Sequence, residues 1–155
     1  MEDLKILEGE KIKNIICEDV SVDDMEFVKQ SSEKMIQLCM ERGGLGLAAP
    51  QVGINKKFFI WMNTENSFEV VINPSYYPQE KKVTNVAESC LSLPEENNYI
   101  VKRYKKIRVV FYVYDNLNNK FIKFFRVLSD GNAFVWQHEI DHLYGKTIDE
   151  IGTLL

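Results

Sequence analysis

The segment that decides the architecture runs from position 130 to position 145 and reads DGNAFVWQHEIDHLYG. Its apolar residues and histidines recur with the spacing of one helix face. Ser129 or Asp130 can cap the start of such a helix, and Gly145 stands just past its end. The sequence therefore predicts a helix over residues 130–144.

This helix carries the stretch His138-Glu139-Ile140-Asp141-His142, which contains both histidines of the chain. A spacing of i, i+4 places the two imidazoles on one face a turn apart, close enough to share one divalent ion. Glu139 lies about 100° round the helix axis, beside such an ion. The stretch therefore predicts a metal site, and the alternative is a histidine pair that packs in the core or faces solvent.

A third protein ligand is expected, because catalytic metal sites usually combine three ligands with one open position. One class of metallopeptidase is excluded, since Ile148 stands where that class has a third histidine. Glu150 is a candidate, although too few residues follow His142 to form a second helix that doubles back. Cys90 is favoured, because it stands in a loop-like stretch, residues 88–94, that ends in proline. A cysteine nucleophile with a histidine as its base is the alternative.

A glycine-rich segment, residues 43–53, reads GGLGLAAPQVG and formally matches a dinucleotide-binding fingerprint. The match is rejected, because the segment ends a helix and meets Pro50 where the fingerprint should open one. We expect a flexible segment that lets another backbone approach closely, with the Gln51 amide as a hydrogen-bond donor. A simple helix-ending turn is the alternative.

The remaining periodicities predict one more helix and several strands. The helix covers residues 21–42, with one apolar face that ends at Gly43 and Gly44. A polar cluster over residues 115–119 suits the turn of a hairpin. Helix, strands and then helix predict an α+β fold, with mainly antiparallel sheets packed around the C-terminal metal-binding helix. The predicted strands are residues 58–62, 68–72, 99–103, 107–114 and 121–128.

Composition sets the class of protein. The chain has 155 residues and a formal charge of -4, which fits one domain over residues 1–155. Excess acid argues against a DNA-binding protein, and the basic stretch at residues 102–108 is expected to be a solvated strand edge. Cys17 and Cys39 sit among apolar residues and are expected in the core. An odd set of three widely spaced cysteines and the lack of a signal peptide or a long apolar run predict a cytoplasmic protein with no membrane contact.

Three segments together resemble the peptide deformylase family. Residues 44–51 (GLGLAAPQ), 88–92 (ESCLS) and 137–145 (QHEIDHLYG) match its motifs in order and spacing. The resemblance implies a metal-dependent hydrolase that removes the N-formyl group from the initiator formyl-methionine of nascent polypeptides and releases formate. Its substrates would be N-formylmethionyl peptides, met as nascent chains at the ribosome. Some family members dock on the ribosome through a basic C-terminal extension. Residues 152–155 end this sequence without such an extension, so this mode of docking is not expected.

The resemblance also implies the ligands and the catalytic groups. One divalent ion, commonly Fe²⁺ and replaceable by Zn²⁺ or Ni²⁺, would be held by Cys90, His138 and His142. Glu139 would move the proton, while the Gln51 amide and the Leu91 backbone N–H would stabilise the oxyanion. The substrate-binding residues would be Gly44, Leu45, Gly46, Ser89, Phe134 and Val135.

Two further inferences concern individual positions. Ser89 replaces a glycine that is usual in the second motif, and its Cβ is expected to affect substrate docking. Asp141 points away from the ion, and we predict that its partner is Arg103, which matches an arginine of the family in the strand before the hairpin. The alternatives to an active deformylase are a catalytically weak or inactive relative that binds peptide N-termini, and a small metallopeptidase.

Overall fold

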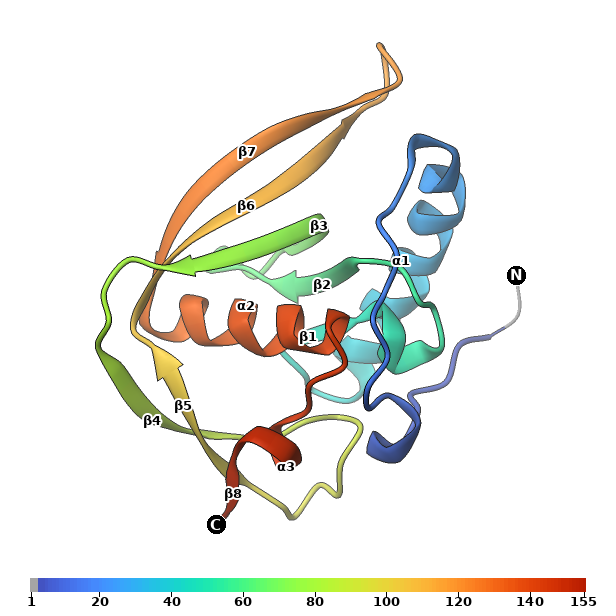
Figure 1. Ribbon diagram of the computed structural model, residues 1–155. Coiled ribbons are helices and arrows are strands. Elements are labelled where there is room, and N and C mark those ends of the chain that lie inside the picture. The colour runs from blue at the N-terminus through green and yellow to red at the C-terminus, as the bar shows by residue number, and fades with distance from the viewer. Residues whose placement is uncertain (1–2) are drawn as a thin grey trace.

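The computed structural model describes residues 3–155, and Figure 1 shows the C-terminal helix α2 lying between two sheets. Strands of the larger sheet follow the order β1-β2-β3-β6-β7, and those of the smaller sheet the order β4-β5-β8. All pairings between these strands are antiparallel. The predicted fold class, antiparallel sheets around a C-terminal helix with a further N-terminal helix, is therefore confirmed.

The elements of the described chain are, in order, η1 (Gly9–Lys11), η2 (Val22–Asp24), α1 (Met25–Glu41), β1 (Gly46–Ala48), η3 (Ala49–Val52), β2 (Phe58–Met62), β3 (Phe68–Pro78), β4 (Val83–Glu88), β5 (Tyr99–Tyr104), β6 (Lys106–Asp115), β7 (Lys120–Ser129), α2 (Asp130–Leu143), α3 (Ile148–Ile151) and β8 (Thr153–Leu154). The η elements are short 3-10 helices. Among residues 3–155, no helix is long and apolar enough to cross a membrane.

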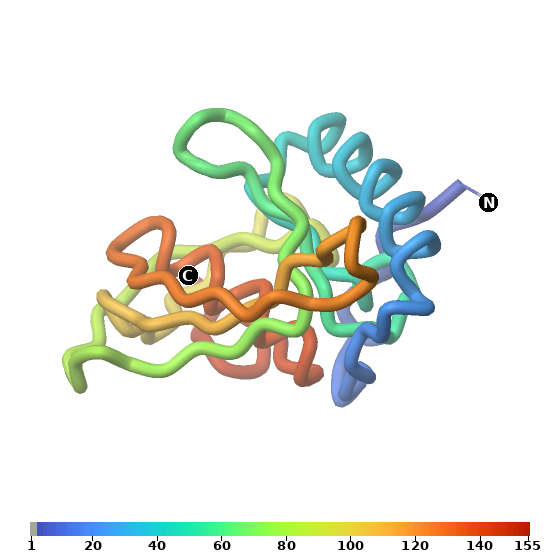
Figure 2. Tube along the Cα trace, turned by 90° about the horizontal axis from the view of Figure 1, so that it is seen from above, coloured from blue at the N-terminus to red at the C-terminus, as the bar shows by residue number. Residues whose placement is uncertain are grey.

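Strand β2 is apolar throughout because a helix covers each of its faces. Phe58 and Ile60 belong to a cluster with the buried face of α1, whereas Phe59 and Trp61 belong to one with α2. Successive strand residues point to opposite sides, so a strand covered on both sides needs apolar residues at every position. Figure 2 gives a second view in which α1 and α2 again lie apart from each other. The centre of the larger sheet thus forms a rigid support for α2.

Trp136 is the largest side chain at the contact between α2 and the larger sheet. It is fully buried and makes edge-to-face contacts with Phe59 and Trp61, at ring-centroid distances of 5.2 and 5.7 Å. Phe111 of β6 lies 5.4 Å away on the same measure. Because such contacts are close-packed, they fix the position and rotation of α2 against the sheet.

The structure corrects several predicted boundaries. Strand β3 does not end at residue 72 but continues to Pro78, after a β-bulge between Ile72 and Ser75. Asn73 makes the bulge possible, because it adopts a positive φ of 49° and its amide pairs with the backbone of Val20. The sequence Asn73-Pro74 looks like a strand end, but here it is an interruption.

Other differences lie in short or polar elements. The predicted helix over residues 21–42 is a 3-10 turn followed by α1, which ends at Glu41 before Gly43 takes a φ of 68°. The glycine-rich segment is no simple turn, since β1 pairs with β2 inside it. Strand β4 is missing from the prediction because its six residues alternate between exposed and half-buried, and its apolar residues do not alternate with polar ones. The hairpin of β6 and β7 forms as predicted.

Candidate metal centre

Cys90, His138 and His142 come together at one point beside α2. Their ligand atoms all lie within 4.8 Å of one another, and the Cys90 Sγ is 3.5 Å from the His142 Nε2. Both histidines stand on α2, and Cys90 follows the end of β4. The structure therefore brings together the three predicted ligands into a group that could hold a metal ion, as one thiolate and two imidazoles do in many proteins. Glu150 lies outside this group, at an exposed position where it accepts a hydrogen bond from Thr147.

The His138 ring is oriented by Glu88, a residue outside the predicted site. The distance from His138 Nδ1 to Glu88 Oε1 is 2.8 Å. Burial would raise the pKa of Glu88, but hydrogen bonds from Arg103 and His138 lower it to about 2, so Glu88 is a carboxylate. A carboxylate at Nδ1 selects the tautomer whose Nε2 is free to bind a metal. The sequence signal that could have placed Glu88 near the metal group is its i, i+2 spacing from Cys90. In an extended chain this spacing puts two side chains on the same side.

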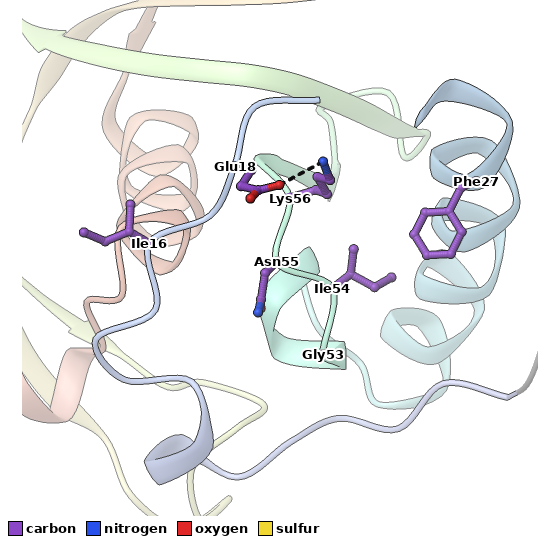
Figure 3. Close-up of a pocket in the computed structure, with 7 residues that line it drawn as sticks. All are labelled: Ile16, Glu18, Phe27, Gly53, Ile54, Asn55 and Lys56. Carbon is purple, nitrogen blue, oxygen red and sulfur yellow. Dashed lines mark hydrogen bonds and ion pairs between the residues drawn. The ribbon is translucent and has the colours of Figure 1, made fainter. Parts of the chain in front are cut away.

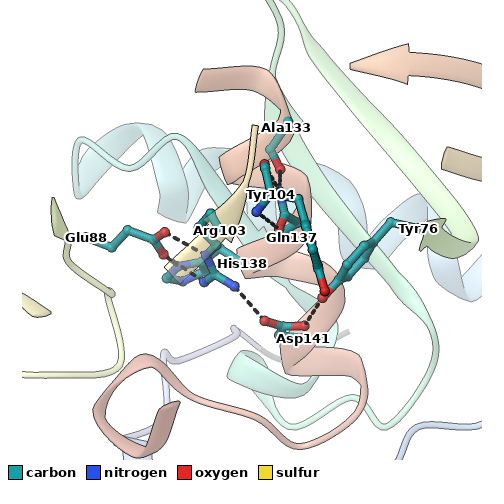
Figure 4. A network of polar contacts seen from close by, with 8 residues as sticks. All are labelled: Tyr76, Glu88, Arg103, Tyr104, Ala133, Gln137, His138 and Asp141. Carbon is teal, nitrogen blue, oxygen red and sulfur yellow. Dashed lines mark hydrogen bonds and ion pairs between the residues drawn. The ribbon is translucent and has the colours of Figure 1, made fainter. Parts of the chain in front are cut away.

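Arg103 and Asp141 form the predicted pair, with 2.7 Å between Arg103 Nη1 and Asp141 Oδ2. The prediction is thus confirmed. Arg103 also donates hydrogen bonds to both carboxylate oxygens of Glu88, from Nε to Oε2 at 2.7 Å and from Nη2 to Oε1 at 2.9 Å (Figure 4). Only 2% of its side chain is exposed, so one member of the basic stretch at residues 102–108 lies in the interior and not at a solvated strand edge.

Glu139 lies in the interior next to the metal group, with 4% of the residue exposed. Its Oε1 has no hydrogen-bond partner among the residues that the structure describes. Burial raises the pKa of Glu139 to about 7, and the charge of Glu88 adds to this effect. On the other side stands Gly46, where a Cβ would lie 2.7 Å from the Glu139 Oε2. An unpartnered buried carboxylate oxygen at this point fits a site that takes up water or a polar ligand.

Gln51 reaches the same site from η3. Its Oε1 accepts a hydrogen bond from the Ala48 N–H at 2.9 Å, which fixes the amide. Its Nε2 donates to the Ser92 hydroxyl at 3.1 Å and toward the Cys90 Sγ at 3.5 Å. Leu91 follows Cys90 in a turn closed by a 3.0 Å hydrogen bond from the Leu93 N–H to the Cys90 carbonyl. Both predicted oxyanion donors are therefore next to the metal group in space or in sequence.

The six predicted substrate-binding residues lie on three segments. Gly44 touches the Leu91 side chain, since a Cβ built on it would be 2.8 Å from Leu91 Cδ1. Leu45 and Ser89 are exposed, and Gly46 opens β1, which among the described strands pairs with β2 alone. Phe134 and Val135 are half-buried on α2, and Val135 packs against the cluster around Trp136.

A separate hollow of about 480 Å³ lies on another part of the surface, between the segment that precedes α1 and the one that follows η3 (Figure 3). None of its lining residues belongs to the metal group or to the predicted substrate-binding set. It is lined by Ile16, Glu18, Phe27, Gly53, Ile54, Asn55 and Lys56.

Comparison with known proteins matches residues 5–153 to the family model described as polypeptide deformylase. The peptide deformylase of Thermotoga neapolitana is 38% identical over 123 residues, which cover 79% of this chain and 71% of the relative. The peptide deformylase of Halalkalibacterium halodurans is 31% identical, and the match covers 94% of this chain and 86% of the relative.

Solved structures agree with this similarity. The crystal structure of peptide deformylase from Thermotoga maritima matches with a TM-score of 0.80 and 30% identity, covering 97% of this chain and 98% of that one. The actinonin-bound crystal structure of class I type b peptide deformylase from Acinetobacter baumannii matches with a TM-score of 0.83 and 28% identity. This match covers 97% of this chain and 99% of that one.

Proposed function

This chain belongs to the peptide deformylase family, and on that premise we propose that it hydrolyses the N-formyl group of formyl-methionine at the start of nascent polypeptides and releases formate. Its relatives are peptide deformylases, and the geometry of its site supports the same activity. The observation that carries the proposal is the group of Cys90, His138 and His142 with the buried, unpartnered oxygen of Glu139 beside it. No observation favours an inactive relative.

We propose that the group holds one divalent ion per chain. A thiolate together with two imidazoles suits Fe²⁺, Zn²⁺ and Ni²⁺, and Fe²⁺ is the proposed native metal. When bound, such an ion supplies positive charge that acidifies a water molecule and polarises the formyl oxygen. Burial lowers the pKa of His142 well below its usual value and the charge of Arg103 adds to this effect, which leaves this imidazole neutral as a ligand must be.

The protein's own groups would move the proton and stabilise the developing charge. Glu139 takes a proton from the attacking water and gives one to the departing amine, for which its position beside the metal group suits it. Gln51 Nε2 and the Leu91 N–H would donate to the formyl oxygen as the carbon becomes tetrahedral. Because the Ala48 N–H already holds the Gln51 carbonyl oxygen, this donor is fixed before the substrate arrives.

The free edge of β1 offers a place for the peptide. An extended substrate can pair with the backbone of Gly44, Leu45 and Gly46 as a further strand. Ser89 would then lie on the other side of the bound peptide. The absence of a Cβ at Gly46 leaves Glu139 room beside it. Phe134 and Val135, which precede His138 on α2, would line the pocket for the methionine side chain.

We further propose that residues 1–155 act as a single catalytic domain in the cytoplasm, on nascent chains at the ribosome. A membrane or DNA partner is not part of the proposal. The chain's excess of acidic residues agrees with this, since binding to nucleic-acid phosphates needs clustered positive charge.

The test is an assay on a formyl-methionyl peptide, with protein purified anaerobically and its metal quantified. Release of formate supports the proposed activity. Release of amino acids would instead indicate a metallopeptidase, and tight binding without any product would indicate a non-catalytic relative. Loss of formate release on removal of the metal, and its return on adding Fe²⁺ or Ni²⁺, is expected.

A further inference from the structure

We propose that Tyr76 is a positioning residue for the metal centre and acts on His138 from a distance. Its hydroxyl group is the outermost link of a chain of hydrogen bonds that continues through Asp141, Arg103 and Glu88 (Figure 4). The inference rests on the proposed metal site, and it assigns a function to a residue of β3 that is not itself one of the three proposed ligands.

The first link fixes the Asp141 carboxylate. Tyr76 donates to Oδ1 at 3.0 Å, and Arg103 donates to Oδ2 at 2.7 Å. The two donors come from different sheets, β3 of the larger and β5 of the smaller, and they hold the carboxylate from opposite ends. Without the hydroxyl group, Oδ1 would lose this donor, and the carboxylate could rotate about its bond to the chain.

The next links carry this orientation to the metal ligand. Arg103 reaches Asp141 with Nη1 while Nε and Nη2 grip Glu88, so one planar guanidinium group joins the two carboxylates. Glu88 Oε1 lies 2.9 Å from Arg103 Nη2 and 2.8 Å from His138 Nδ1. Because the guanidinium fork is rigid, a turn of Asp141 shifts the oxygen that orients the imidazole.

Burial gives the hydroxyl group a second reason to matter. The side chains of Glu88 and Asp141 are only 10% and 9% exposed. Carboxylate oxygens in the interior require hydrogen-bond donors, because water cannot supply them there. Burial and the Asp141 carboxylate raise the pKa of Tyr76 well above its usual value, so the phenol keeps its proton and acts as a donor.

The bulge in β3 is what brings the hydroxyl group to this place. Ile72 pairs with Tyr112, but after the bulge Tyr76 pairs with Val109. An uninterrupted register starting from Ile72 would pair Tyr76 with Arg108 and turn its side chain to the outer face of the sheet. The extra residue therefore turns Tyr76 inward toward α2.

The simpler explanation is that the hydroxyl group only ties β3 to α2. Tyr76→Phe distinguishes the two, because it keeps the ring and removes one donor. The measured quantity is the Zn²⁺ affinity of the full chain, by competition with a chromophoric chelator. We expect roughly tenfold weaker binding at unchanged stoichiometry, at the lower end of the range for residues that orient metal ligands.

Tyr77→Phe is the matched control. It removes the same atom from the next residue of the same strand, where Tyr77 is 55% exposed on the opposite face. Its Zn²⁺ affinity should equal that of the wild type. If Tyr76→Phe also equals the wild type, whether or not its stability toward urea falls, the positioning role is wrong. If the wild type binds no Zn²⁺, the proposed function fails instead.

A second comparison tests the route. In a Glu88→Ala background no side chain links Arg103 to the imidazole, so adding Tyr76→Phe should change the Zn²⁺ affinity by less than about twofold. A further tenfold loss there would mean that Tyr76 acts by another path and would overturn the proposal. The Nδ1 proton resonance of His138 gives an independent reading, and it should shift or broaden in Tyr76→Phe but not in Tyr77→Phe.

Discussion

Replacing Arg103 by methionine should destabilise the protein far more than the same change at Arg126. Each arginine grips a carboxylate with two nitrogens, Glu88 for Arg103 and Glu69 for Arg126. The difference is burial, since the side chains of the first pair are 2% and 10% exposed and those of the second 39% and 32%. Arg103 also holds Asp141, so its loss leaves two buried carboxylates without their cation.

The expected loss for Arg103→Met is about 3–5 kcal/mol of unfolding free energy, because buried charges lose their partner. For Arg126→Met it is at most about 1 kcal/mol, as for exposed ion pairs. With an m-value of about 2 kcal/mol per molar urea, the midpoint should fall by roughly 2 M in the first variant and by at most about 0.5 M in the second.

Urea unfolding of the metal-free proteins, followed by circular dichroism, gives both midpoints. Arg103→Lys completes the series, since it keeps the positive charge but loses the fork and should fall between the wild type and Arg103→Met. Equal midpoint shifts for Arg103→Met and Arg126→Met would refute the reasoning, because burial would then not decide the strength of these pairs.

Three further outcomes are expected. Cys90→Ala should lose stoichiometric metal as measured by elemental analysis, because the Cys90 thiolate is one of the three proposed ligands, and retention of one ion per chain would contradict the ligand assignment. Ser89→Gly should lower KM with kcat less affected, since the proposed docking places the peptide against this Cβ, whereas a changed kcat at constant KM would point to the oxyanion donors. Arg126 lowers the pKa of Glu69, so the stability that Glu69 adds should be present above about pH 4.5 and lost in more acidic solution; urea titrations of Glu69→Gln should approach the wild type there, and an unchanged gap would contradict this.

Periodic apolar patterns account for the elements that could be predicted from the sequence. The α2 helix and β2 have such patterns because one is packed on a sheet and the other is covered on both faces. Strand β4 has no such pattern, since it lies in the small sheet with no residue fully buried. The continuation of β3 past Asn73 depends on a side-chain contact with Val20, 53 residues away, which local sequence does not reveal.

The site residues likewise include some that could be predicted from the sequence and some that could not. The pair of histidines stands on one helix, so their spacing alone indicates that they meet. The pairing of Arg103 with Asp141 was predictable because Arg103 matches an arginine of the family. Glu88 and Tyr76 were not found, because their contacts to His138 and Asp141 span 50 and 65 residues and depend on how β4 and β3 are placed against α2.

The central claim is that metal and carboxylate together hydrolyse the formyl group. The most direct measurement compares the wild type with Glu139→Gln, each loaded with one equivalent of the same metal, for formate release from a formyl-methionyl peptide. Glu139→Gln is expected to keep the metal and the fold but to lose about 10²–10⁴-fold in kcat, because the amide cannot accept the proton of the water. A loss of less than about tenfold, with metal still bound, would contradict the account.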